Sequence, residues 1–264
     1  MTKIDEDMLL NAIKNIKGDG TLGEKLLASP GDLFFSSSDL LRDKETHNKI
    51  MIMGLNPGGD PKSESVGSLG SNISKYWDDD SFKSYSGFID RCWHSKADLK
   101  KAGHHKEPFH HYTPSKTYAE CPICSKNGGV VPVGMQRVMQ ELFQNSVIKV
   151  DLRKSITLNA IFMQSIRGSV DLKDNSLIAN YSNHSVSNFF KEYLYPIHKI
   201  ILGIVKPKLV LCLGHGDQSP FSLFRRAIEP NPQQERDSCG ATNSAFWKYF
   251  NYDGIHFLGI HHPA

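Results

Sequence analysis

Four short apolar runs recur along the chain, and each is closed by glycine, proline or a polar residue. They are Ile50–Gly54, Ser155–Met163, Leu209–Leu213 and Ile255–Ile260. Runs of this length with such stops are typical of buried strands. Each is therefore predicted to be a strand.

The segments between these runs carry apolar residues at helical spacing. The predicted helices are Ile4–Lys17, Leu22–Leu27, part of Tyr76–Trp93, Val133–Asn145, Ser187–Val205 and Ser219–Ile228, while the stretch from Gly54 to Ser74 is predicted to be a Gly/Ser-rich loop. Pro196 should kink or split the fifth helix, and Ser219 followed by Pro220 should begin the sixth. Strands alternating with helices predict an α/β fold with a central, mostly parallel four-stranded sheet.

Composition narrows the class of protein. The 264 residues are 39% hydrophobic and 22% charged, which is typical of a soluble globular protein. No apolar stretch reaches the roughly 18 residues of a membrane span, and the first ten residues do not resemble a secretory signal. We therefore expect a cytoplasmic protein that forms a single domain over residues 1–264, with N-terminal helices in residues 1–45.

Charge and nucleotide motifs exclude some partners. Subtracting 28 acidic from 31 basic residues gives a net charge of +3, which permits nucleic-acid binding without arguing for it. Neither a GxGxxG nor a GxxxxGK[ST] motif occurs, so dinucleotide and P-loop nucleotide binding lose support.

Asn56 follows the first predicted strand, at the position where open α/β sheets place their ligands. Asn, Pro and Gly are also the commonest turn residues, so this segment alone favours a plain turn. Two further strand ends change the balance. Asn159 lies on the second strand, and His262 follows the fourth.

Together these three strand ends resemble the uracil-DNA glycosylase superfamily, most closely its mismatch-specific and single-strand-selective branches. Gly54–Gly58 (Gly-Leu-Asn-Pro-Gly) is similar to the G-[IM]-N-P-G motif that positions water. Leu158–Ala160 is similar to the strand bearing the uracil-reading Asn, and His262–Ala264 to the H-P-S motif after the last strand. The resemblance implies a three-layer α/β/α, uracil-DNA glycosylase-like domain and a monofunctional DNA glycosylase of base-excision repair.

The resemblance also implies roles for particular residues. Asn56 would orient the attacking water, and His262 would donate a hydrogen bond to the departing base; these two are the expected catalytic residues. Asn159 would present a donor and an acceptor to the base edge. The expected substrate-binding residues are Gly54, Leu55, Pro57, Gly58, Asn159, Leu69 and Ser165.

The chain departs from the family pattern in three places. Gly58 replaces a bulky aromatic that would exclude a 5-methyl group. The family's stacking Phe is missing, so we expect Leu69 or Tyr76 to substitute for it. No wedge residue follows Ala264, which favours single-stranded or mismatched uracil-containing DNA as the substrate of a monomeric enzyme.

Residues 92–129 are rich in Cys, His and Lys and are interpreted as an insertion. Cys121 and Cys124 have the C-x₂-C spacing of a zinc site, and structural zinc takes four N or S ligands. Two further ligands are expected from Cys92, His94, His105 and His111, with Cys92 and His105 as the leading pair. The alternative is an exposed His-rich loop with two reduced thiols. No metal is expected to take part in catalysis.

Two other functions stay open. The protein could be a catalytically silent superfamily member that binds nucleic acid or a nucleotide through the same pocket and the insertion. It could also be an α/β hydrolase of another small metabolite.

Overall fold

The computed structural model describes residues 3–16, 20–34, 48–57, 67–78, 154–166, 169–229, 235–237 and 247–260. The helices in these ranges are α1 (Lys3–Lys14), α2 (Leu22–Ala28), α4 (Leu69–Asp78), α9 (Ser169–Leu172), α10 (Ser176–Ser182), α11 (Val186–Phe189), the π-helical turn η5 (Phe190–Leu194), α12 (Tyr195–Val205) and α13 (Pro220–Ile228). The strands are β1 (Ile50–Gly54), β2 (Ile156–Asn159), β3 (Leu209–Leu213), β4 (Glu235–Asp237), β5 (Trp247–Tyr252) and β6 (Ile255–Ile260).

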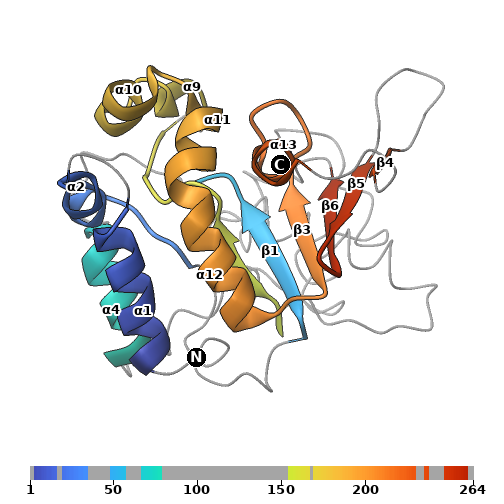
Figure 1. The fold of residues 1–264 in the computed structure, drawn as a ribbon, viewed down its shortest axis with the longest axis horizontal. Helices are drawn as coiled ribbons and strands as arrows, with labels where there is room; N and C mark the ends of the chain where they lie inside the picture. Colours follow the sequence, from blue (N-terminus) through green and yellow to red (C-terminus); the bar gives the residue numbers. More distant parts are fainter. Residues whose placement is uncertain are drawn as a thin grey trace, which may run out of the picture.

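All strands form one sheet in the order β2-β1-β3-β6-β5-β4 (Figure 1). The first four are the predicted strands, and they run parallel to one another. The prediction of an α/β fold is confirmed, but the sheet is not four-stranded: β5 and β4 extend it antiparallel to six strands within the described residues. Because β1, β2, β3 and β6 are parallel, the residues that follow them share one edge of the sheet.

Sequence analysis predicted β6 but not β5, and so missed the β5–β6 hairpin. Its two-residue turn is Asp253-Gly254, with φ of 51° and 74°. Two consecutive residues with positive φ make a type I′ turn, for which Asp-Gly is a preferred pair. Phe250 and Phe257 stack across the hairpin with ring centroids 4.6 Å apart, which places both rings in the core.

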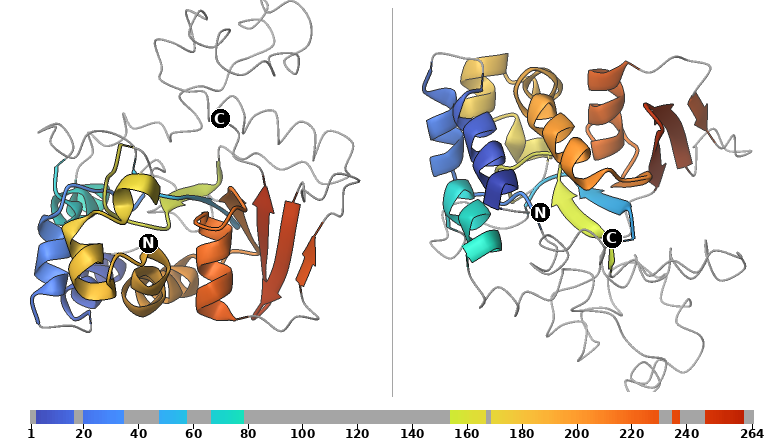
Figure 2. Two further views of the ribbon diagram at one scale, coloured as in Figure 1. Left: turned by 90° about the horizontal axis from the view of Figure 1, so that it is seen from above. Right: turned by 60° about the horizontal axis from the view of Figure 1, so that its bottom comes forward.

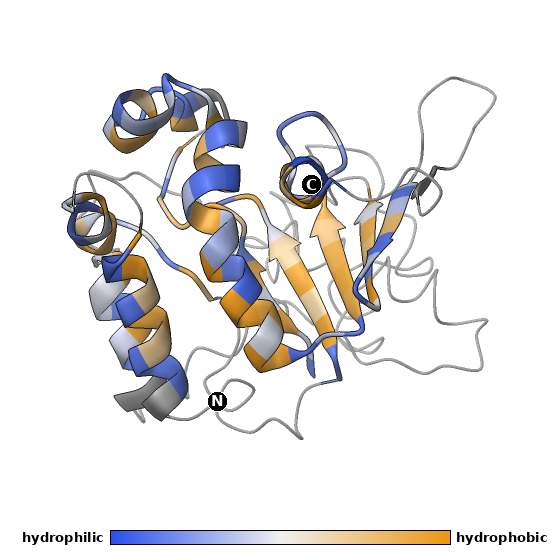
Figure 3. Ribbon diagram, viewed as in Figure 1, coloured by the Kyte–Doolittle hydropathy of each residue, from blue (hydrophilic) through white to orange (hydrophobic). Residues whose placement is uncertain are grey.

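Helices α1, α12 and α13 lie on one side of the sheet (Figure 2). In Figure 3 the strands β1 and β3 are mainly hydrophobic, whereas α1 and α12 carry hydrophobic and hydrophilic residues in alternation. Apolar side chains of these helices and of one sheet face form a continuous core, with Leu9, Ile13, Met53, Ile201 and Phe224 at or below 1% exposure. A helical layer on the other face, as a three-layer domain requires, stays a prediction.

The predicted helix Ser187–Val205 is split as expected near Pro196. Its residues form α11, the π-helical turn η5 and then α12, which has Pro196 in its first turn. Proline lacks an N–H and clashes with the carbonyl of the preceding turn, so a helix restarts more easily there than it continues.

Helix α4 corrects a second prediction, because its residues 69–74 were expected to be loop, whereas its last residues fall in the stretch Tyr76–Trp93 that was predicted to be helical in part. Its Leu69 and Ile73 are at most 1% exposed and pack into the core. Glycine at position 70 and serines at 71 and 74 masked this helical pattern in the sequence.

Candidate functional site

The candidate site lies where β1 and β2 end side by side. Gly54 pairs in register with Asn159. Beyond this pair, the loop after β2 donates main-chain hydrogen bonds to the loop after β1: Ala160 N to Gly54 O (2.8 Å), Ile161 N to Leu55 O (2.7 Å) and Ser165 N to Pro57 O (3.2 Å). The two loops are therefore held as one unit, and the side chains they carry have fixed positions.

Asn56 is oriented by two hydrogen bonds from its amide nitrogen. Nδ2 donates to the Pro57 carbonyl (2.9 Å) and to Ser165 Oγ (3.0 Å). A carbonyl can only accept, so the contact with Pro57 fixes which end of the amide is nitrogen. Both Nδ2 hydrogens are used, and among the described residues no donor reaches Oδ1. Asn56, half-buried, therefore presents an oriented acceptor.

Asn159 is held more tightly. Its side chain is buried, 2% exposed, and Nδ2 donates to the main-chain carbonyl of Asp32 (3.1 Å). Oδ1 lies over Gly54, where an added Cβ would be 3.3 Å away. A side chain at position 54 would crowd the Asn159 amide. Gly54, at the end of β1, therefore allows Asn159, at the end of β2, to take this position.

Asp32 was not predicted as a site residue, yet it touches Asn159. Residues 30–34 lie along the outer side of β2 and the loop after it, with bridges at Gly31–Met163 and Phe34–Leu158. Asp32 N donates to Phe162 O (3.0 Å), and Asn159 N donates to Leu33 O (2.9 Å). Residues 29–32 have the sequence Ser-Pro-Gly-Asp, which is typical of a turn, so nothing in the sequence pointed to the end of β2.

The Asp32 carboxyl group is in an unfavourable place for a charge. Oδ1 is enclosed and has no hydrogen-bond partner among the described residues. Burial raises the pKa of this carboxyl from 3.8 to about 7, although the amides of Leu33 and Phe34 and the charge of Lys75 act in the opposite direction. It is therefore a carboxyl that changes charge near neutral pH.

Asn72, in α4, supports the same segment from its other side. Its Nδ2 donates to Gly31 O (2.8 Å), and the residue is 8% exposed. Buried amides that satisfy main-chain carbonyls fix local geometry, because leaving such a carbonyl unpaired costs about 1–3 kcal/mol. The position of Asp32 is thus determined by contacts on both sides of the residue.

His198, in α12, supports the turn after β2 from the core. Its Nε2 lies 2.8 Å from Ala160 O, which can only accept, so Nε2 carries the proton. The ring packs against Phe162, Phe190 and Phe224 at centroid distances of 5.1, 5.4 and 5.1 Å. Burial lowers its pKa from 6.5 to about 4, so the imidazole is neutral at physiological pH.

The structure brings some predicted site residues together. Gly54, Leu55, Asn56, Pro57, Asn159 and Ser165 all lie in the two linked strand ends. Leu69 does not belong with them: its side chain is 1% exposed within the core, so it has no surface on which a base could stack. Gly58 and His262 lie outside the described residues.

The predicted zinc ligands Cys92, His105, Cys121 and Cys124, together with the whole insertion, also lie outside the described residues. Within the described part of the chain, no three His, Cys, Asp or Glu side chains gather as metal ligands. Cys212, in β3, is a buried free thiol whose pKa is raised by burial. This thiol is an inert core group and not a ligand.

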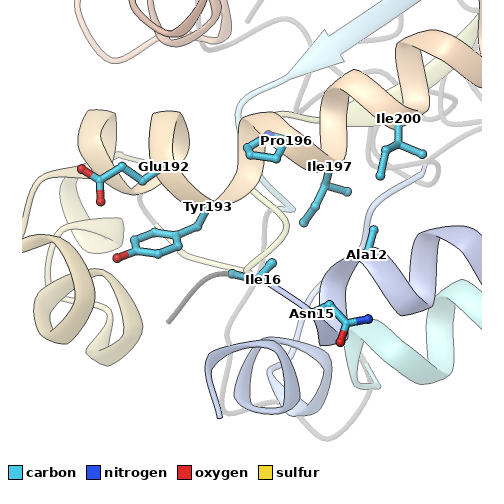
Figure 4. A pocket seen from close by; sticks show the side chains of 8 residues that line it. All are labelled: Ala12, Asn15, Ile16, Glu192, Tyr193, Pro196, Ile197 and Ile200. Atoms are coloured by element: carbon cyan, nitrogen blue, oxygen red, sulfur yellow. The ribbon is translucent and has the colours of Figure 1, made fainter. Parts of the chain in front are cut away.

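A pocket of about 290 Å³ lies between α1 and the helical segment formed by η5 and α12 (Figure 4). Its lining residues are Ala12, Asn15, Ile16, Glu192, Tyr193, Pro196, Ile197 and Ile200. None of the predicted site residues is among them, so this pocket belongs to the helical layer and not to the strand ends.

Comparisons with protein-family models, with curated proteins and with solved structures found no match for this chain. Among the described residues, no helix has the length and apolar character needed to cross a bilayer.

Proposed function

We propose that this protein is a monofunctional DNA glycosylase that hydrolyses the N-glycosidic bond of uracil or a related deaminated base. The fixed acceptor of Asn56 carries this proposal. Hydrolysis requires a water held near C1′ of the sugar, and an oxygen that cannot rotate away is suited to hold it. Because Nδ2 already donates to Pro57 O and Ser165 Oγ, Oδ1 is the end that would face that water.

Asn159 supports the same function. Its amide cannot flip, since Nδ2 is committed to the Asp32 carbonyl, and this leaves Oδ1 and one N–H in known directions. An acceptor facing the base edge favours the N3–H of uracil over the unprotonated N3 of cytosine. On this proposal the deaminated base is selected by an amide whose orientation is set by the main chain.

The remaining parts of the proposal rest on the resemblance. His262 would donate to the departing base, and Gly58 would leave room beside it. The Cys/His-rich insertion would hold one structural zinc through Cys121 and Cys124, and single-stranded or mismatched DNA would be the partner. A uracil-DNA glycosylase-like, three-layer fold is part of the same proposal.

The second candidate is a catalytically silent protein that binds nucleic acid or a nucleotide with the same residues. The burial of Asn159 favours it, because an amide 2% exposed and bonded to the main chain also serves a purely structural purpose. The two candidates differ in whether the glycosidic bond is broken.

The test uses the full chain and end-labelled single-stranded oligonucleotides with one uracil, hypoxanthine, xanthine or thymine. Abasic sites are revealed by alkaline cleavage. We expect release of uracil, a loss of about 100-fold in Asn56→Ala, and a smaller loss in Ser165→Ala, which removes only one of the two acceptors. Asn188→Ala, an exposed Asn on α11, is the matched control and should keep the wild-type rate. Tight binding of the uracil strand without cleavage would support the silent candidate, and equal rates in all variants would remove the enzymatic one.

A further inference from the structure

Basic residues lie at the amino ends of the four parallel strands, at the edge of the sheet opposite the candidate site. They are Lys154 before β2, Lys49 before β1, Lys206 and Lys208 before β3, and His256 near the start of β6. We call these five residues the basic row. In Figure 1 this edge is the lower end of β1 and β3, away from their arrowheads.

Main-chain hydrogen bonds hold the basic row in the order of the strands. Asn48 N, next to Lys49, donates to Lys154 O (3.0 Å), and Lys208 N donates to Lys49 O (2.8 Å). His256 N then donates to Lys208 O (3.0 Å). Neighbouring strands lie about 4.8 Å apart, so the row extends over about 14 Å from the first strand to the fourth. The basic residues therefore follow one another along the edge in a fixed order.

The lysine side chains of the basic row can be reached by a partner. Lys154, Lys206 and Lys208 are exposed, and among the described residues no carboxylate pairs with any of them. The β5–β6 turn at the end of the row adds one acid, Asp253. Positive charge thus predominates in the row, and such an edge attracts an anionic partner.

Aromatic side chains lie at the β6 end of the basic row. Tyr252, the last residue of β5, is 37% exposed. Burial raises the pKa of Tyr195, and Tyr252 adds to this rise, so the two hydroxyl groups lie together. Nζ of Lys199 is 5.7 Å from the centroid of the Tyr195 ring, which brings a further cation to the same place. Single-stranded nucleic acids bind to this combination, because bases stack on an exposed ring while lysines neutralise the phosphates.

We propose that the basic row binds the phosphate backbone of a single-stranded nucleic acid, and that one of its bases stacks on Tyr252. The bases of a duplex are stacked on one another, so a duplex offers this ring little to bind. Membrane surfaces also attract lysines, but proteins that lie on them commonly use an amphipathic helix with large apolar side chains, whereas the basic row lies on strand ends.

This surface is separate from the candidate site. Lys49 and Asn56 flank β1 at opposite ends, so roughly 20 Å lies between the two surfaces at the rise of a strand. A nucleic acid held by the basic row is bound without presenting a base to Asn56. The proposal therefore does not depend on the proposed glycosylase function.

The test measures binding of the full chain to a labelled oligothymidylate of about 20 nucleotides, which contains no uracil, by fluorescence anisotropy. Three phosphate contacts give a slope of about −2 in a plot of log affinity against log salt, so binding should weaken about 20-fold between 50 and 200 mM salt. The triple variant Lys154→Gln/Lys206→Gln/Lys208→Gln should bind at least about tenfold more weakly at 50 mM salt, with a flattened slope.

A matched triple variant controls for net charge. Lys14→Gln/Lys173→Gln/Lys248→Gln removes the same charge from α1, the segment after α9 and β5, and should keep the wild-type affinity and slope. The ring is tested by Tyr252→Ala, which should weaken binding about tenfold without changing the slope, because stacking is not an ionic contact. Tyr252→Phe keeps the ring and should bind like the wild type, as should Asn56→Ala.

Several results would overturn the proposal, whether or not the protein releases uracil from other oligonucleotides. They are the absence of binding in the wild type, an equal loss in both triple variants, and a loss in Asn56→Ala that the variant of the basic row does not share. Unchanged affinity in Tyr252→Ala would overturn the stacking contact. Polyglutamate and phosphatidylserine vesicles are the competing partners. If either binds through the same lysines at least as tightly as the oligothymidylate, the partner is an acidic protein or a membrane and not a nucleic acid.

Discussion

Asp32 and His198 should make opposite contributions to the pH dependence of stability, and two substitutions should reveal them. Asp32→Asn removes a carboxyl whose pKa is raised by burial, and His198→Gln removes an imidazole whose pKa is lowered by burial. Gln keeps an N–H for Ala160 O, which the imidazole now contacts at 2.8 Å. The free energy of unfolding is the quantity that each change should alter.

The sign differs for the two groups. The pKa of Asp32 is raised from 3.8 to about 7 in the folded state, so the folded protein binds this proton more tightly, and stability is lost as pH rises from about 4 to 7. The pKa of His198 is lowered from 6.5 to about 4, so the unfolded chain binds that proton more tightly, and stability is lost as pH falls from 6.5 to 4. Between pH 4 and 6.5, unfolding therefore takes up one proton at His198 and releases one at Asp32.

Asp32 and His198 each change the free energy of unfolding with pH, with slopes of opposite sign. The two slopes cancel in the wild type, and each variant retains only one of them. Each slope is about 1.4 kcal/mol per pH unit. From pH 6.5 to 4.5, Asp32→Asn should lose about 3 kcal/mol relative to the wild type, because only the histidine slope remains. Over the same interval His198→Gln should gain about 3 kcal/mol relative to the wild type, and the double variant should follow the wild-type curve.

Urea unfolding at pH 4.5, 5.5, 6.5 and 7.5, followed by intrinsic fluorescence, measures these differences. Other titrating groups affect all variants alike, so the difference between each variant and the wild type is what matters. Differences that do not change with pH would show that neither side chain is buried in the folded protein as described, and the reasoning would be refuted. Asp32→Asn should also be more stable than the wild type at pH 7.5, by at most about 4 kcal/mol.

Three further predictions follow from other contacts. Asn56→Asp should lower stability by about 1–3 kcal/mol in urea unfolding and slow uracil release, because a carboxylate cannot donate to Pro57 O; faster release would contradict the orientation of this side chain. Gly259→Ala should lower stability by about 1–3 kcal/mol, since the new Cβ would lie 2.7 Å from the Phe221 ring, and an unchanged melting temperature would show that α13 moves away freely. Elemental analysis should find about one zinc per chain that is lost in Cys121→Ser, and zinc retained at the wild-type level in that variant would remove this residue from the ligand set.

Much of the fold could be predicted because its strands are locally encoded. Ile50–Gly54, Leu209–Leu213 and Ile255–Ile260 have the predicted bounds, since a buried parallel strand is a nearly continuous apolar run. The second strand is shorter than predicted, ending at Asn159, because the loop after it is buried as well and the apolar run continues past the strand. Strand β5 was missed because its sequence, Trp-Lys-Tyr-Phe-Asn-Tyr, mixes polar and aromatic residues and is not a continuous apolar run.

The candidate site could be predicted only in part, for a related reason. Asn56 and Asn159 lie at the ends of apolar runs, so the sequence predicts that both lie at the sheet edge. Ser165 was expected at the same edge. Asp32 lies 127 residues before Asn159, in a segment that has only a turn pattern. Its burial and raised pKa are properties of the residues that surround it after folding.

By itself the sequence determined the parallel strands, the helix boundaries at Pro196 and Ser219, and the two amides at the strand ends, because hydrophobic periodicity and capping act over a few neighbouring residues. Only the tertiary structure decided which end of each amide is free, that His198 holds the turn after β2, and that a carboxyl group is enclosed beside Asn159. Hydrogen-bond direction and desolvation depend on partners distant in the chain, so no local pattern encodes them.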